Sequence, residues 1–152
     1  MQRLAILIAT LGPIGTKLPA PGSWGSLAAL LMGAVILSFG WLYMAFATMA
    51  ALLIGIWASD IYHKQTGKKD ASEVIIDEVA GQWSVLLVTP MSLEGFIIAF
   101  CLFRFFDILK PFPVNKAEKI EGAIGVMADD MVAGGLAAMI MLALLAGGVL
   151  SL

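Results

Sequence analysis

The sequence predicts an all-α protein, a polytopic membrane helix bundle with about five membrane-embedded helices in a single domain, residues 1–152. The mean hydropathy is +0.96, and charged residues make up only 13% of the chain. Soluble domains carry about 25% charged residues. No charged residue occurs from Leu18 to Ser59, and one spanning helix needs about 20 apolar residues. That run therefore holds two spans.

Breaks in the apolar pattern separate the expected helices. Gly40 and the interfacial residue Trp41 suit a tight hairpin between two spans. Pro90 marks a second break because proline cannot continue a helix. We expect helices near 24–40, 41–66, 73–89, 92–110 and 128–150, with the N-terminal segment packed at the membrane edge. The third and fourth of these are short or carry charges, so we interpret them as inner helices shielded by the others.

The distribution of charges predicts one polar end of the bundle. When the chain is folded at Gly40 and Pro90, every charged residue except Glu94 lies on the side of the N-terminus. That side carries all nine lysines and arginines, which the positive-inside rule assigns to the cytoplasm. We therefore expect a polar site at the cytoplasmic edge of the membrane. A soluble helical bundle does not account for the long uncharged runs.

Composition excludes several classes of function. A net charge of −2 without a basic stripe argues against a nucleic-acid partner. The single cysteine, Cys101, cannot form a disulfide within the chain, and we expect it to be a small buried apolar side chain. His63 is expected to be an interfacial side chain and receives no catalytic role.

Two acidic pairs, Asp77-Glu78 and Asp129-Asp130, precede apolar runs. Ionisable groups in membrane segments require partners and usually have a function, and paired carboxylates are typical ligands of divalent metals. For Asp77 and Glu78, stabilisation of a helix start by acidic residues is an equally good interpretation. For Asp129 and Asp130, placed in the first turn of the last helix, we favour metal binding because capping needs only one aspartate.

Basic side chains accompany the acidic pairs. Arg104, Asp107 and Lys110 follow one another at intervals of three and form a polar stripe on an aromatic helix. An Arg104–Asp107 ion pair is the simple explanation, but each charge costs about 2.5–3.5 kcal/mol to place in lipid. Shared use with a phosphate or a metal explains the stripe better. The acids and bases together predict phosphoryl chemistry at a membrane surface.

A glycine- and hydroxyl-rich segment contains Ser23 and Ser26. Such segments bind anions at helix N-termini, although either serine could instead cap the helix. Small residues at Gly81 and Gly134 would allow close approach of neighbouring helices.

Four motifs follow one another along residues 12–135. They are Pro21-Gly-Ser-Trp-Gly-Ser26, Asp77-Glu78-x-x-Gly81-x-Trp83, Phe103-Arg104-x-x-Asp107-x-x-Lys110-Pro111-x-Pro113 and Gly125-x-x-x-Asp129-Asp130-x-x-Ala133-Gly134. In this order they resemble the phosphatidylglycerophosphatase A family. Ser23 replaces the usual threonine of the first motif, and Ala123 stands where a second glycine is common.

The resemblance implies a multi-pass enzyme of the bacterial inner membrane with its active site facing the cytoplasm. It implies Mg²⁺-dependent hydrolysis of phosphatidylglycerophosphate, a lipid of the inner leaflet, to phosphatidylglycerol and phosphate during phospholipid biosynthesis.

We expect the acidic pairs to hold one or two Mg²⁺ ions that activate water. The expected metal ligands are Asp77, Glu78, Asp129 and Asp130. The expected phosphate-binding residues are Arg104, Lys110, Lys69, Ser23 and Ser26. Asp107 would complete the catalytic set by orienting Arg104 or accepting a proton from water; a covalent route stays open.

Two other functions compete with this one. A small membrane cation transporter or channel subunit would have its acidic residues near the bilayer midplane, whereas these cluster at one edge. A purely structural membrane subunit leaves the Arg104–Lys110 stripe unexplained.

Overall fold

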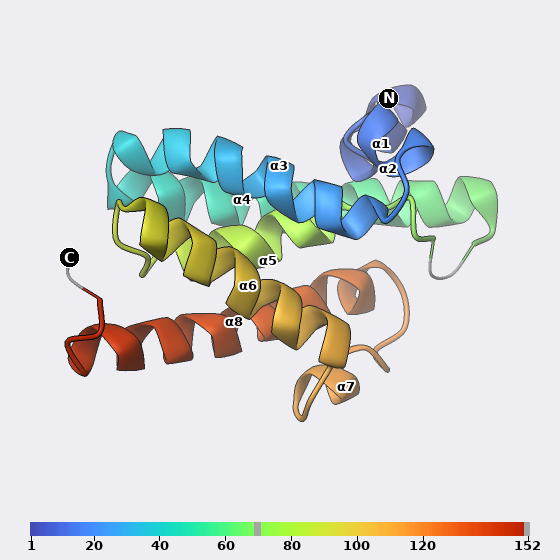
Figure 1. Cartoon of the computed structure of the whole chain (residues 1–152). Coiled ribbons are helices and arrows are strands. Elements are labelled where there is room, and N and C mark those ends of the chain that lie inside the picture. Colours follow the sequence, from blue (N-terminus) through green and yellow to red (C-terminus); the bar gives the residue numbers. More distant parts are fainter. Residues whose placement is uncertain (69–70, 151–152) are drawn as a thin grey trace.

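The computed structural model describes residues 1–68 and 71–150 (Figure 1). Within these ranges, helices are the only regular secondary structure, and turns and loops connect them. The elements are α1 (Gln2–Ala9), α2 (Pro13–Lys17), α3 (Pro21–Ser38), α4 (Trp41–Thr66), α5 (Ile76–Leu86), α6 (Leu93–Leu109), α7 (Val114–Ala117) and α8 (Ala123–Ala146). The predicted all-α class is confirmed. Lys69, an expected phosphate ligand, lies outside the described residues.

Three helices within these ranges, α3, α4 and α8, are long and apolar enough to cross a membrane. The expectation of about five membrane-embedded helices is therefore supported for three spans. α5 and α6 are shorter, with 11 and 17 residues. Apolar side chains on the outer faces of the bundle, such as Leu31, Phe46 and Leu142, are exposed, which is typical of a surface that meets lipid.

The short helix α5 forms the centre of the bundle. It packs against α8, α3, α4 and α6, and Figure 1 shows it between the α3–α4 pair and α8. Eight of its residues are buried. The interpretation of this segment as an inner helix is confirmed for α5. α6 lies nearer the outside and exposes Cys101, so the expectation of a buried cysteine is wrong.

The breaks between helices have the expected local causes. Gly40 has a φ of 121° between α3 and α4, a conformation that glycine adopts at little steric cost. α5 ends before Pro90. The hydroxyl of Ser92 then caps α6 by accepting a hydrogen bond from the N–H of Gly95 at 3.0 Å.

Two helix starts differ from the predictions. α3 begins at Pro21, which suits the first helical position, so neither Ser23 nor Ser26 is its cap. α8 begins at Ala123, after Gly122 with a φ of 82°. Asp129 and Asp130 therefore lie beyond the first turn of α8, and the prediction that they occupy that turn is wrong.

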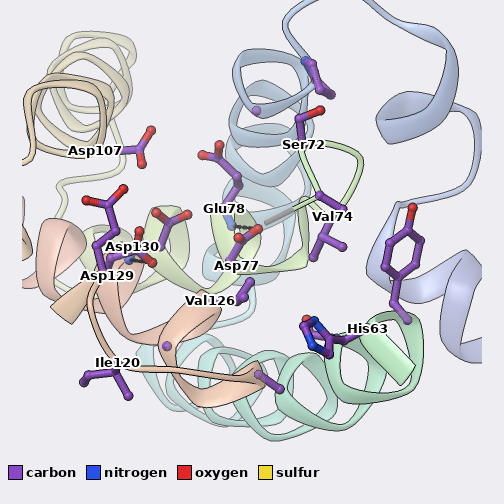
Figure 2. Close-up of a pocket in the computed structure, with 18 of the residues that line it drawn as sticks. His63, Ser72, Val74, Asp77, Glu78, Asp107, Ile120, Val126, Asp129 and Asp130 are labelled. Atoms are coloured by element: carbon purple, nitrogen blue, oxygen red, sulfur yellow. Dashed lines mark hydrogen bonds between the residues drawn. The ribbon is translucent and has the colours of Figure 1, made fainter. Parts of the chain in front are cut away.

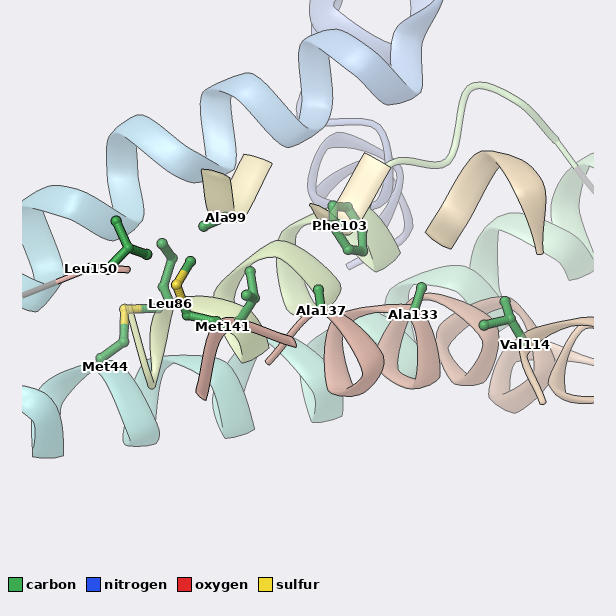
Figure 3. Close-up of a cluster of buried hydrophobic side chains, with 10 residues drawn as sticks. Met44, Leu86, Ala99, Phe103, Val114, Ala133, Ala137, Met141 and Leu150 are labelled. Atoms are coloured by element: carbon green, nitrogen blue, oxygen red, sulfur yellow. The ribbon is translucent and has the colours of Figure 1, made fainter. Parts of the chain in front are cut away.

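The hydrophobic core follows α8 along its buried face (Figure 3). Ala133, Ala137 and Met141 of this helix are fully buried and pack with Phe103 of α6 and Met44 of α4. Ala133 and Ala137 have small side chains, which lets the neighbouring helices approach α8. This core occupies the apolar part of the bundle and leaves the charged residues other than Glu94 at one end.

α5 and α8 pack closely against each other at two glycines. A Cβ atom at Gly134 would collide with the carbonyl oxygen of Gly81, and a Cβ atom at Gly81 would lie 2.7 Å from the carbonyl oxygen of Asp130. Both obstacles are backbone atoms, so no side-chain rotation relieves them. The predicted close helix approach at these two glycines is confirmed.

We predict that Gly134→Ala destabilises the protein by about 1–3 kcal/mol relative to Gly135→Ala, because only the first places a methyl group against backbone. Gly135 has open space at its Cβ position, so both variants share the gain in helix propensity and differ in the clash. Thermal unfolding in detergent, followed by circular dichroism, measures the difference. Equal midpoints would contradict the tight crossing.

Candidate functional site

A cavity of about 820 Å³ lies at the charged end of the bundle. It is bordered by the last turns of α4, the first turns of α5 and α8, the C-terminal end of α6 and the start of α3. Figure 2 shows the acidic side chains gathered within it. The predicted polar edge is therefore a pocket rather than a flat charged surface.

Three carboxylates from three helices converge in this pocket. Glu78 of α5, Asp107 of α6 and Asp130 of α8 each offer an oxygen, and these oxygens all lie within 4.8 Å of one another. Asp130 is 4% exposed, and its Oδ2 has no hydrogen-bond partner among the described residues. Such an all-oxygen set suits a hard divalent cation. The sequence led us to expect Asp107 to orient Arg104 or to accept a proton from water, and the structure also places it beside Glu78 and Asp130.

Arg104 supplies positive charge directly beside these carboxylates. Its Nη1 lies 2.6 Å from Oε2 of Glu78 and 2.8 Å from Oδ2 of Asp107. The side chain is only 14% exposed, so water screens these ion pairs weakly. The predicted Arg104–Asp107 pair is present, and Glu78 joins it.

Ser26 and Ser23 complete the surroundings of Arg104. The hydroxyl of Ser26 lies 2.6 Å from Oε2 of Glu78 and 3.2 Å from Nη1 of Arg104. Nη2 of Arg104 lies 3.5 Å from the hydroxyl of Ser23. A Cβ atom at Gly22 would collide with Oε1 of Glu78, so this glycine makes room for the carboxylate. Both serines thus belong to the site through their hydroxyls.

Lys110 forms a second cationic position. Its Nζ lies 2.9 Å from Oδ2 of Asp129 and 2.6 Å from Oε1 of Glu118. Lys110 is the C-cap of α6 with a φ of 43°, and the following Pro111 prevents the helix from continuing. Glu118 was not identified from the sequence, because it belongs to no motif and reaches Lys110 only through the loop after α6.

The two acidic pairs share one local arrangement. Oδ1 of Asp77 accepts a hydrogen bond from the N–H of Glu78 at 2.9 Å, and Oδ1 of Asp129 accepts one from Asp130 at 3.1 Å. In each pair, the carboxylate of the first residue thus fixes the backbone N–H of the second residue by a hydrogen bond. The second residue, Glu78 or Asp130, contributes to the cluster with Asp107.

The site carries an excess of negative charge. Seven acidic side chains line the pocket, against four lysines and arginines. The acidic residues are Asp77, Glu78, Asp107, Glu118, Glu121, Asp129 and Asp130, and the cations are Lys68, Arg104, Lys110 and Lys119. Additional positive charge is needed before a phosphate, itself an anion, can bind here. The arrangement therefore fits the combined binding of a divalent cation and a phosphate.

Comparison with known proteins identifies the family. Residues 7–145 match the family model described as Phosphatidylglycerophosphatase A. The chain belongs to this family. The four motifs of the sequence analysis all lie inside the matched range, so the predicted resemblance is confirmed. With its three candidate spans, the family member is a membrane protein.

Named relatives agree with this assignment. Phosphatidylglycerophosphatase A of Haemophilus influenzae is 40% identical over 118 residues, covering 76% of this chain and 72% of the relative. The Escherichia coli protein of the same name is 31% identical over 116 residues, covering 75% and 67%. A Bacteroides thetaiotaomicron protein named "Putative phosphatidylinositol-3-phosphatase" is 38% identical over 139 residues, covering 86% and 87%. No solved structure matches.

We predict that Arg104→Gln destabilises the metal-free protein by about 3 kcal/mol, because it leaves buried carboxylates without their counter-ion. Lys64→Gln is the matched control, since the Lys64–Asp60 pair is exposed and such pairs contribute at most about 1 kcal/mol. Unfolding midpoints in detergent with EDTA test both variants. Equal stability of the two variants would show that Arg104 does not neutralise the cluster.

Proposed function

We propose that this protein is a Mg²⁺-dependent phosphatase that hydrolyses phosphatidylglycerophosphate to phosphatidylglycerol and phosphate in phospholipid biosynthesis. The observation that carries this proposal is the convergence of Glu78, Asp107 and Asp130 beside Arg104 at the charged end of an apolar bundle. Family membership and the names of two relatives support the same substrate.

The residues present fit a magnesium site. The ligands would be carboxylate oxygens, which Mg²⁺ prefers. Oδ2 of Asp130 is buried and has no hydrogen-bond partner among the described residues, so it can bind the ion. Glu78, Asp107 and Asp130 would hold the ion, with Asp77 and Asp129 orienting the backbone of their neighbours. When bound, Mg²⁺ would supply charge neutralisation for the phosphomonoester and a more acidic water.

The cationic side chains bind the phosphate group in this proposal. The guanidinium of Arg104 is planar and matches two phosphate oxygens at once, and its Nη2 is directed toward Ser23. Lys110 approaches from the side of Asp129 and acts as a point charge. Ser23 donates a hydroxyl hydrogen bond to the phosphate, whereas Ser26 donates its hydroxyl to Oε2 of Glu78 and supports the site through that carboxylate. Lys69 would be an additional cation.

The location of the site supports a lipid head-group as substrate. The pocket lies where apolar helices end, so acyl chains can remain in lipid while the head-group enters the pocket. A transporter or channel subunit is less well supported, because the acidic residues gather at one end of the helices rather than near the middle of the spans.

The proposed setting is the bacterial inner membrane, crossed several times, with the pocket facing the cytoplasm. The positive-inside rule supports this orientation, because the described lysines and arginines surround the pocket end while Glu94 begins α6 at the other end. A substrate in the inner leaflet would then meet the site directly.

Phosphate release in detergent tests the activity. We predict that Asp130→Asn lowers release from phosphatidylglycerophosphate on the order of 100-fold, since it removes a metal ligand. Glu94→Gln, an exposed change at the opposite end of the bundle, should retain wild-type activity.

The wild-type protein should lose activity in EDTA and regain it with Mg²⁺. Activity that persists in EDTA, or in folded Asp130→Asn, would overturn the metal assignment. Phosphatidylinositol 3-phosphate is the comparison substrate, because one relative carries that name; faster turnover of this lipid would replace the proposed substrate.

Orientation is tested by cysteine labelling in a Cys101→Ser background. We predict that Lys119→Cys, at an exposed position beside the pocket, reacts with a membrane-impermeant maleimide only from the cytoplasmic side. Glu94→Cys, exposed at the other end, should react only from outside. The reverse pattern would show that the pocket faces away from the cytoplasm.

A further inference from the structure

The pocket extends well beyond the acidic cluster. Its other half is formed by the end of α4 and the segment before α5, and it includes Ser59, His63 and Ser72. Figure 2 shows His63 and Ser72 on the opposite side of Asp77 from Asp107. A phosphate with its metal ion does not need this second half, which contains hydroxyl and imidazole side chains and none of the clustered carboxylates.

Ser59 has an unused hydrogen-bonding group. The residue is 3% exposed, lines the pocket, and its hydroxyl has no partner in the part of the chain that the structure describes. On the same helix, Thr48 and Thr66 donate to carbonyl oxygens four residues earlier, at 2.8 and 2.9 Å. A buried hydroxyl without a partner is unfavourable, so Ser59 is suited to a ligand in the pocket.

His63 and Lys68 lie close to this hydroxyl along the chain. His63 follows Ser59 by four residues, which places both on one face of α4, and both line the pocket. Lys68 also borders the pocket and is held by Glu73 at 2.6 Å. The hydrogen bond from Lys68 lowers the pKa of Glu73, so this pair is charged at neutral pH.

The proposed substrate has groups that match this half. Besides its terminal phosphomonoester, the head-group of phosphatidylglycerophosphate contains a glycerol hydroxyl and a phosphodiester. The phosphomonoester would occupy the acidic half with Arg104. Hydroxyl and imidazole groups can hydrogen bond to the remaining glycerol hydroxyl and diester oxygens.

We propose that Ser59 and His63 form a subsite for the glycerol and phosphodiester portion of the head-group. The subsite selects phosphatidylglycerophosphate over phosphatidic acid, whose phosphomonoester is attached directly to diacylglycerol. This inference rests on the proposed function and assigns substrate selection to residues outside the four motifs.

Kinetics with short-chain forms of both lipids test the subsite. Ser59→Ala and His63→Ala should each lower kcat/KM for phosphatidylglycerophosphate about five- to tenfold, the loss expected for one hydrogen bond. Neither change should alter kcat/KM for phosphatidic acid. Asp60→Asn is the matched control, because Asp60 lies between them on α4, pairs with Lys64 and does not line the pocket.

Equal losses for both lipids, or no loss for either, would overturn the subsite while leaving the phosphatase activity in place. Equilibrium binding of phosphatidylglycerol in EDTA gives an independent measurement, because this lipid has the glycerol and phosphodiester portion but no phosphomonoester that needs the metal. The wild-type protein should bind phosphatidylglycerol more tightly than diacylglycerol, and Ser59→Ala should remove that preference. If neither phosphatidylglycerophosphate nor phosphatidic acid is hydrolysed, the proposed function fails, and the binding preference still decides whether the subsite exists.

Discussion

Carboxylates buried at the end of an apolar bundle need positive charge within a few ångströms, and this requirement explains the arrangement of the pocket. Burying an unpaired charge costs several kcal/mol. Arg104 meets the requirement for Glu78 and Asp107, and Lys110 meets it for Asp129. Asp130 keeps an oxygen without a partner among the described residues. The protein thus satisfies most of its buried charge internally and leaves a remainder that suits a divalent cation.

Close packing of helices makes this electrostatic arrangement possible. α5 and α8 touch through Gly81 and Gly134, and α3 reaches the carboxylate of Glu78 because Gly22 has no side chain. Larger residues at these positions would separate the helices that carry Glu78 and Asp130. The glycines near the acidic residues therefore determine the distances between the proposed metal ligands, although none of them contributes a functional group.

Hydropathy and charge were sufficient to predict the three spans α3, α4 and α8 and the polar end, because lipid imposes long apolar runs. The last helix was expected near 128–150, but α8 starts at Ala123. Gly125 allows its first turn to pack against the carbonyl of Ile120. The contact between Ser26 and Glu78 joins residues 52 positions apart. Such contacts depend on how helices cross, and neither spacing nor composition contains that information.

The two halves of the pocket differ in the side chains that line them. The acidic half is built from motif residues whose spacing made them visible, because charge in an apolar sequence stands out. The other half uses Ser59 and His63 on α4, where a serine in a membrane helix resembles any small packing residue. The unpaired hydroxyl of Ser59 can be recognised only in the structure. The hydroxyls of Thr48 and Thr66 donate hydrogen bonds to carbonyl oxygens of α4, whereas that of Ser59 does not. Substrate selection by hydroxyl and imidazole groups is accordingly harder to detect in sequence than phosphate chemistry, even when both lie in one cavity.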